Sequence, residues 1–225
     1  MEAIVKIGGS LAENPEALRA LCSELSQIAK ERSIVVVPGG GRFVDAVREY
    51  DRRFSLPPAV SHRLAILGMD QYGLLLSHVT PNSCVFSLLE EAQRLCEAKK
   101  VPVFLPSKLL FEDDPFEASW DVTSDSIAAY VACKLRADKL VLITDVDGVF
   151  TSDPKSHRDA QLLDEVSVDE LLNLGERTSV DKHLPQMLAK TGLDCYVVNG
   201  LYPERVDAVL AGQRTTCTRI VRRSE

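Results

Sequence analysis

The chain has 225 residues, of which 45% are hydrophobic and 26% are charged, a composition typical of a soluble globular α/β protein. Its net charge of −7 argues against a nucleic-acid partner, because no basic face is available to neutralise phosphates. The longest apolar runs are far too short to cross a bilayer, so we expect no membrane partner either.

Six cysteines are scattered along the chain without a CxxC pair, namely Cys22, Cys84, Cys96, Cys133, Cys195 and Cys217. This spacing predicts neither a metal site nor a disulfide framework. Met1 leads directly into a predicted strand without a signal peptide. We therefore expect a cytoplasmic location.

Short apolar strands alternate with helical patterns. The predicted strands are apolar runs rich in β-branched residues, at 3–7, 34–37, 101–105, 140–144, 195–198 and 217–221. The predicted helices begin at Asn14-Pro15, where the asparagine caps the first turn, and continue at 41–52, 58–78, 123–136 and after Tyr202. Continuously apolar strands predict an α/β fold, a three-layer αβα sandwich with a central, mostly parallel sheet. In such sheets ligands bind beyond the carboxyl ends of the strands.

The first strand ends in a glycine turn with the sequence KIGGS at 6–10. Two glycines let the backbone approach an anion, while Lys6 supplies a mobile cation and Ser10 a hydroxyl donor. The structural alternative is a plain turn with a solvated lysine.

The second strand ends in PGGGR at 38–42. Three adjacent glycines are costly in a loop that only turns, but they suit a backbone that wraps a phosphate at the start of a helix. Arg42 then stands where it can clamp an acceptor phosphate; a loose loop with a surface arginine is the alternative. Neither turn has the spacing of a P-loop or of a dinucleotide fold.

A third strand end carries TDVDGVF at 144–150, followed by Asp153, Pro154 and Lys155. The ligand spacing of an EF-hand calcium loop is missing. A structural hairpin explains the Asp147-Gly148 pair equally well from this segment alone.

Taken together, KIGGS, PGGG, TSDSIAA at 123–129 and TDVDGVF resemble, in this order, the amino-acid kinase superfamily. The match covers nearly the whole chain. It implies ATP-dependent phosphoryl transfer with Mg²⁺, an acceptor-binding lobe at about 1–120 and a nucleotide-binding lobe at about 121–225. It also implies a homo-oligomer, for which the leucine-rich helix 58–78 is a candidate interface.

By that resemblance Lys6 contacts the transferring phosphoryl group, and Asp125 is the acid that positions it. The implied ATP-binding residues are Lys6, Gly8, Gly9, Ser10, Thr144, Asp145, Gly148, Phe150, Asp153 and Lys155. The implied acceptor-binding residues are Gly39, Gly40, Gly41, Arg42, His62, Trp120, Asp121, Thr123 and Asp181. No protein ligand for a metal is assigned.

One departure from the family lies at 178–184, which reads TSVDKHL where many members carry TGGMxxK. Leu184 therefore stands at the position of a second lysine, and Lys182 and Lys155 are the candidate substitutes. Uridylate kinases also lack that lysine. Isopentenyl phosphate kinases carry a histidine about where this chain has Asp45, which argues against that branch.

Within the superfamily, SWDVTSDSIAA at 119–129 and VVNGLYPERV at 197–206 most resemble the kinases of methanofuran biosynthesis, which convert an aminomethyl-furan phosphate to its diphosphate. That acceptor offers an ammonium, a flat ring and a dianion. Trp120 is the candidate to stack on the ring, and Asp121 or Asp181 to pair with the amine. Core packing of Trp120, helix capping by Asp121 and a structural His62 are the alternatives.

Two other functions stay open at this point. One is a nucleoside monophosphate kinase of the uridylate type. The other is a non-catalytic nucleotide-binding or storage member of the superfamily, against which the presence of both Lys6 and Asp125 argues.

Overall fold

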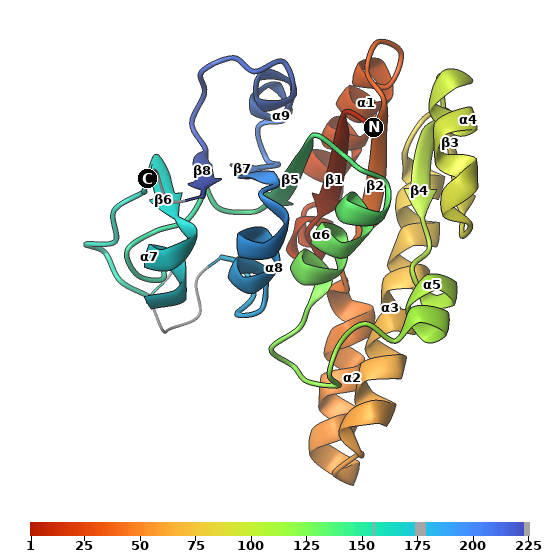
Figure 1. Cartoon of the computed structure of the whole chain (residues 1–225), viewed down its shortest axis with the longest axis vertical. Coiled ribbons are helices and arrows are strands. Elements are labelled where there is room, and N and C mark those ends of the chain that lie inside the picture. Colours follow the sequence, from red (N-terminus) through yellow and green to blue (C-terminus); the bar gives the residue numbers. More distant parts are fainter. Residues whose placement is uncertain (155, 174–178, 223–225) are drawn as a thin grey trace.

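The computed structural model describes residues 1–154, 156–173 and 179–222. Their strands form one eight-stranded sheet in the order β3-β4-β2-β1-β5-β7-β8-β6 (Figure 1). Neighbouring strands pair in parallel except β7 and β8, which are antiparallel. The strands are β1 Ala3–Ile7, β2 Ile34–Pro38, β3 Ser83–Phe86, β4 Val101–Phe104, β5 Lys139–Thr144, β6 Glu165–Ser167, β7 Asp194–Asn199 and β8 Thr218–Val221.

Helices cover both faces of this sheet. They are α1 Pro15–Ile28, α2 Gly41–Phe54, α3 Pro58–Val79, α4 Ala92–Glu97, α5 Ser107–Asp113, α6 Ser124–Lys134, α7 Val168–Asn173, α8 Leu184–Thr191 and α9 Pro203–Leu210. Buried side chains of α1 and α9 pack in one apolar cluster, and those of α4, α6, α7 and α8 pack in another. The three-layer sandwich with a mostly parallel sheet is thus confirmed.

The central strand β1 shows how the sheet directs side chains toward the site. Successive residues of a strand point to opposite faces. Val5 and Ile7 join the cluster under α1, whereas Ile4 joins the cluster under α6. Lys6 therefore emerges on the α6 face, at the carboxyl end of the strand.

The predicted strands and helices are all present, with ends within two residues of those expected. The expected cap of α1 is also present, since Asn14 accepts a hydrogen bond from the Ala17 amide at 3.1 Å. The prediction missed β3, β6, α4, α5, α7 and α8. These elements are between three and eight residues long. So few residues show too little hydrophobic periodicity to be recognised.

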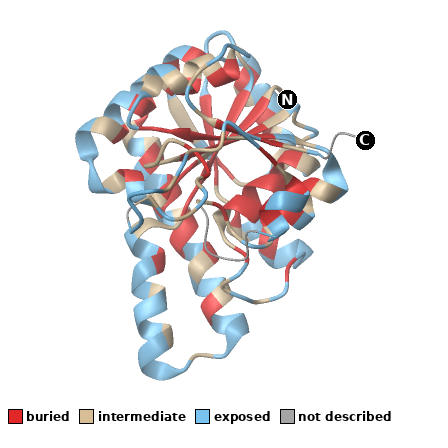
Figure 2. Cartoon of the chain, turned by 90° about the vertical axis from the view of Figure 1, so that its left-hand side faces the viewer, coloured by how far each residue is buried: buried red, intermediate tan, exposed pale blue. Residues whose placement is uncertain are grey.

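The far ends of α2 and α3 project from the sandwich as an antiparallel pair (Figure 1), and their surface there is largely exposed (Figure 2). Even α3, with 22 residues, is not apolar enough for a bilayer. No helix in the described part of the chain meets the length and hydropathy of a membrane span.

Candidate active site

A buried ion pair stands at the carboxyl end of β1. Lys6 Nζ lies 2.7 Å from Asp125 Oδ1, and the two side chains are only 12% and 7% exposed. Asp125 belongs to the first turn of α6, which packs on β1. The structure thus brings together the two residues expected to form the catalytic pair.

The two glycine turns meet beside this pair. The Gly8 amide donates to the Ile143 carbonyl, and the Gly39 amide donates to the Ile7 carbonyl, each at 2.8 Å. A Cβ added to Gly9 would lie 2.1 Å from the Gly41 nitrogen, so the backbones touch where no side chain fits. Gly41 has a φ of 54°, a left-handed conformation that favours glycine. Gly9 is therefore required by the close approach of the other turn, and Gly41 by its own backbone conformation.

We expect Gly9→Ala to lower the free energy of unfolding by about 1–3 kcal/mol, because the methyl group forces the two turns apart. Phosphoryl transfer should fall with it. Denaturant titration and steady-state turnover measure the two effects. Gly212→Ala is the control, since its Cβ meets nothing within 4 Å and only its φ of 70° is penalised. A Gly9 variant with wild-type stability and rate would show that the turns tolerate separation.

Tyr72 is hydrogen-bonded to the first glycine turn. It is 1% exposed in α3, and its hydroxyl donates to the Gly8 carbonyl at 3.2 Å. Burial raises the pKa of this phenol far above its ordinary value, so it is a permanent donor. Sequence reasoning missed Tyr72, because nothing in a leucine-rich helical pattern singles out one buried tyrosine.

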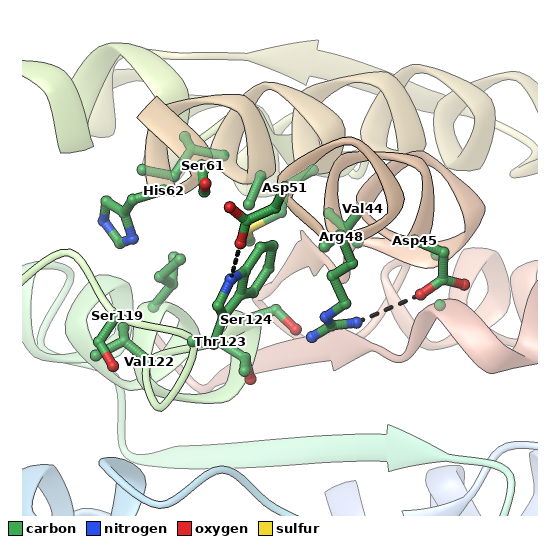
Figure 3. Close-up of a pocket in the computed structure, with 18 of the residues that line it drawn as sticks. Val44, Asp45, Arg48, Asp51, Ser61, His62, Ser119, Val122, Thr123 and Ser124 are labelled. Atoms are coloured by element: carbon green, nitrogen blue, oxygen red, sulfur yellow. Dashed lines mark hydrogen bonds and ion pairs between the residues drawn. The ribbon is translucent and has the colours of Figure 1, made fainter. Parts of the chain in front are cut away.

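A cavity of about 950 Å³ opens between α2, α3 and the segment before α6 (Figure 3). Most of the predicted acceptor residues line it, namely Gly40, Gly41, Arg42, His62, Trp120, Asp121 and Thr123. Gly9 and Ser10 close its glycine end. Gly39 and Asp181 are outside the lining.

Trp120 and Arg42 have protein partners in this cavity. Trp120 Nε1 donates to Asp51 Oδ2 at 2.7 Å, and the guanidinium carbon of Arg48 lies 4.8 Å from the indole centroid. One face of the indole is therefore already occupied by a cation, Arg48. Arg42 forms a two-pronged ion pair with Glu13, at 2.7 and 2.8 Å, and its side chain is 76% exposed. It stands at the rim.

Asp181 serves the fold rather than facing the cavity. One of its oxygens accepts from the Thr123 amide, the Thr123 hydroxyl and the Ser126 amide. The other accepts from the Ser126 hydroxyl and from the amides of His183 and Leu184. The carboxylate thus joins the first turns of α6 and α8, and its six bonds leave no lone pair directed at an amine. Asp121 lies at the exposed rim, 3.5 Å from Lys182.

The third strand end lies beside the first glycine turn, because a Cβ added to Gly8 would lie 3.6 Å from Thr144 Cα. Thr144 ends β5 and, with Asp145, is partly buried. Gly148 lies against Thr218, whose hydroxyl accepts from the Val149 amide at 2.8 Å. Phe150 pairs with Leu162 in an antiparallel bridge whose connecting segment is 151–161, so the Asp147-Gly148 pair does not form the turn of this bridge. Asp153 accepts from the Ser156 hydroxyl at 2.9 Å, and Lys155 lies outside the described residues.

A second ion pair, which sequence reasoning did not assign, joins α9 to the segment that follows β5. Arg205 of α9 donates to Asp147 at 2.7 Å, and Asn199 donates to the same oxygen at 2.9 Å. The Arg205 guanidinium also lies 4.0 Å from the centroid of Tyr202. The sequence VVNGLYPERV at 197–206 could have pointed to this contact, because its polar residue Asn199 ends a buried strand and Arg205 follows it.

Two pKa shifts describe the electrostatics. Burial raises the pKa of Asp125 above its ordinary value, and the nearby Asp181 carboxylate adds to the rise, while Lys6 opposes it. Asp125 therefore needs the Lys6 charge in order to stay ionised. Burial lowers the pKa of His62, against a smaller opposing effect of Asp114, so that imidazole is largely neutral near pH 7.

Comparisons with known proteins agree with this geometry. The model of the amino acid kinase family matches residues 1–199. The chain is 36% identical over 97% of both sequences to a (5-(aminomethyl)furan-3-yl)methyl phosphate kinase of Methanocaldococcus jannaschii. It is 26% identical to a uridylate kinase of Pyrococcus abyssi, over 97% of this chain and 99% of that one. A solved uridylate kinase of Archaeoglobus fulgidus shares the fold, with a TM-score of 0.76 at 22% identity over 98% of this chain and 100% of that one. This chain belongs to the amino acid kinase family.

Proposed function

We propose that this protein is an ATP-dependent kinase that transfers the γ-phosphoryl group of ATP to the phosphate of (5-(aminomethyl)furan-3-yl)methyl phosphate, giving the diphosphate in methanofuran biosynthesis. The buried Lys6–Asp125 pair beside two touching glycine turns carries the reaction type. The acceptor follows from the relative in Methanocaldococcus jannaschii, which matches the chain nearly from end to end.

Phosphoryl transfer needs little covalent help from a protein, but it needs in-line positioning and compensation of the developing charge. In this proposal Lys6 holds the transferring group and Asp125 fixes the ammonium at 2.7 Å. The turn at Gly8, Gly9 and Ser10 surrounds the ATP phosphates, with the amides of Gly9 and Ser10 as donors, because the Gly8 amide is bound to the Ile143 carbonyl. The start of α2 faces the acceptor phosphate, because helix N-termini attract anions.

The remaining assignments divide the site between two lobes. We assign the acceptor to residues at about 1–120 and the nucleotide to about 121–225, although the acceptor cavity also takes in 121–124 and Ile127. Thr144, Asp145, Gly148, Phe150 and Asp153 are proposed to cradle the nucleotide. ATP is proposed to arrive with Mg²⁺, which neutralises phosphate charge and is commonly held by the phosphates, water and one or two carboxylates.

A coupled assay of ADP release tests the proposed acceptor against UMP, AMP and CMP. We expect rapid turnover with the furan phosphate and slow turnover with the nucleotides. If UMP is phosphorylated and the furan phosphate is not, the protein is a nucleoside monophosphate kinase, the function that the uridylate kinase relatives favour. ATP binding without ADP release for any acceptor would favour a storage protein.

Fluorescence of the single tryptophan provides an independent measurement of acceptor binding. Trp120 is bound to Asp51 and lines the cavity. We expect the furan phosphate to change the intrinsic fluorescence saturably, and ADP alone to leave it nearly unchanged, because the nucleotide side is separate. A titration of fluorescence against each ligand measures this. A response to ADP as large as that to the acceptor would contradict the assignment of the two sides.

We also propose a cytoplasmic homo-oligomer. All six cysteines are free thiols, as is usual in reducing compartments. Apolar side chains along one stripe of α3 are 38–54% exposed, namely Val60, Leu64, Leu67, Leu74 and Leu75. Such a stripe suits a second copy of the same helix across a twofold axis. Light scattering on the wild type and on Leu67→Glu tests this, and a wild-type monomer would refute it.

A further inference from the structure

The Asp51 carboxylate lines the cavity without a cationic partner among the described residues. It lies near the end of α2, ten residues after Gly41, which is about 15 Å along the helix from the glycine turn. It is half-buried and lines the cavity, and Trp120 Nε1, a neutral donor, occupies Oδ2. Among the described residues no lysine, arginine or histidine forms an ion pair with it. A partly buried carboxylate with no cation beside it offers a place for a cationic ligand.

Ser61 supplies an independent observation on the same wall. It is 3% exposed in the first turn of α3, and its hydroxyl has no hydrogen-bond partner within the described chain. It lines the cavity with Asp51, and Figure 3 shows the hydroxyl directed into the space beside the Asp51 carboxylate. A buried hydroxyl without a partner is rare and calls for a ligand.

The two ends of the cavity differ in charge. The glycine end presents backbone amides and the start of α2, which suit an anion. The two arginines of α2 that line the cavity are already paired, Arg42 with Glu13 and Arg48 with Asp45. The far end holds Asp51 and Ser61, while burial keeps the neighbouring His62 largely neutral. A ligand with a phosphate at one end and a cation at the other fits this polarity.

We propose that Asp51 and Ser61 bind the primary ammonium of the acceptor and thereby select aminoalkyl phosphomonoesters over nucleoside monophosphates. The inference rests on the proposed function and deepens it. The ammonium donates to Asp51 Oδ1 and to Ser61 Oγ, while Trp120 holds Oδ2. Asp121 is the weaker candidate, because it is 63% exposed and already lies beside Lys182. A uracil ring brings no cation and therefore gains nothing from the Asp51 charge, so the site favours the amine.

The test compares kcat/KM for the aminomethyl furan phosphate with that for its methyl analogue, which lacks only the amine. Asp51→Asn keeps an oxygen that can accept from Trp120 but removes the charge. We expect it to lower kcat/KM for the amine about 10- to 100-fold, mainly through KM, and to change that for the methyl analogue less than about threefold, the scale of one charged hydrogen bond. Ser61→Ala should lower kcat/KM about fivefold for the amine substrate and not for the methyl analogue, without loss of thermal stability.

Two further variants separate recognition from structure. Glu49→Gln is the matched control, because Glu49 is an exposed acid of α2 that pairs with Arg53 outside the cavity lining. It should behave as the wild type. Trp120→Phe removes the donor to Asp51 but leaves its charge, so the preference for the amine over the methyl analogue should persist.

Equal losses on both substrates in Asp51→Asn would mean that Asp51 only positions Trp120, and would overturn the inference alone. So would a wild-type enzyme that does not distinguish the amine from the methyl analogue. A wild-type enzyme that phosphorylates UMP and not the furan phosphate would overturn the proposed function, and the inference with it.

Discussion

Lys6→Ala is expected to lower kcat by at least ~100-fold, within the range seen when one group that stabilises transition-state charge is removed. The Lys6 ammonium is held by Asp125 at 2.7 Å beside the glycine turns, where solvent cannot replace it. Turnover from ADP release measures the loss, with folding verified by circular dichroism. Lys30→Ala is the control, because Lys30 is an exposed lysine in the turn after α1. A rate near that of the wild type would remove Lys6 from the reaction.

The same variant should show a characteristic pH dependence of stability. Burial raises the pKa of folded Asp125 above its unfolded value near 3.8, and Lys6 opposes that rise. An acid with a raised folded pKa binds protons more tightly in the native state, so its contribution to stability is lost as pH rises. Removing Lys6 raises the folded pKa of Asp125 further, so more stability is lost as the pH rises. The deficit of Lys6→Ala in unfolding free energy should therefore be larger near pH 7 than near pH 4; a deficit independent of pH would contradict this.

Asp181→Ala is expected to destabilise the protein by about 3 kcal/mol, because it removes the acceptor of several partly buried backbone and hydroxyl donors. Its carboxylate accepts six hydrogen bonds, four of them from backbone amides at the first turns of α6 and α8. Their loss leaves several buried donors unpaired. For a chain of this size the melting temperature should fall by roughly 10 °C.

Activity should also fall in this variant, because the Asp181 amide donates to Asp125 at 3.1 Å and thereby couples the network to Lys6. Thermal unfolding is the measurement. Asp121→Ala serves as the stability control, since its exposed side chain should cost no more than about 0.5 kcal/mol. A melting temperature of Asp181→Ala equal to that of the control would show that the six contacts carry little energy.

The sequence predicts much of the frame of this site. Continuously apolar β-branched runs indicate buried parallel strands, and the glycine turns at their ends indicate where anions bind. The roles of Lys6 and Asp125 follow from the resemblance to the family, and the contact between the two is present. The short elements β3, β6 and α8 escape this reasoning because tertiary pairing, rather than local pattern, stabilises them.

The acidic residues show what the sequence leaves open. Asp51, Asp121 and Asp181 stand in similarly polar stretches, and only Asp121 and Asp181 were assigned to the acceptor. Packing gives each a different environment: Asp181 is enclosed by two helix starts, Asp121 is exposed, and Asp51 meets a tryptophan 69 residues away. The principal strands and the glycine turns at their ends are local properties that the sequence by itself determined. The partners of each charge were decided only by the tertiary structure, because burial and contacts between distant segments set the free energy of a charge.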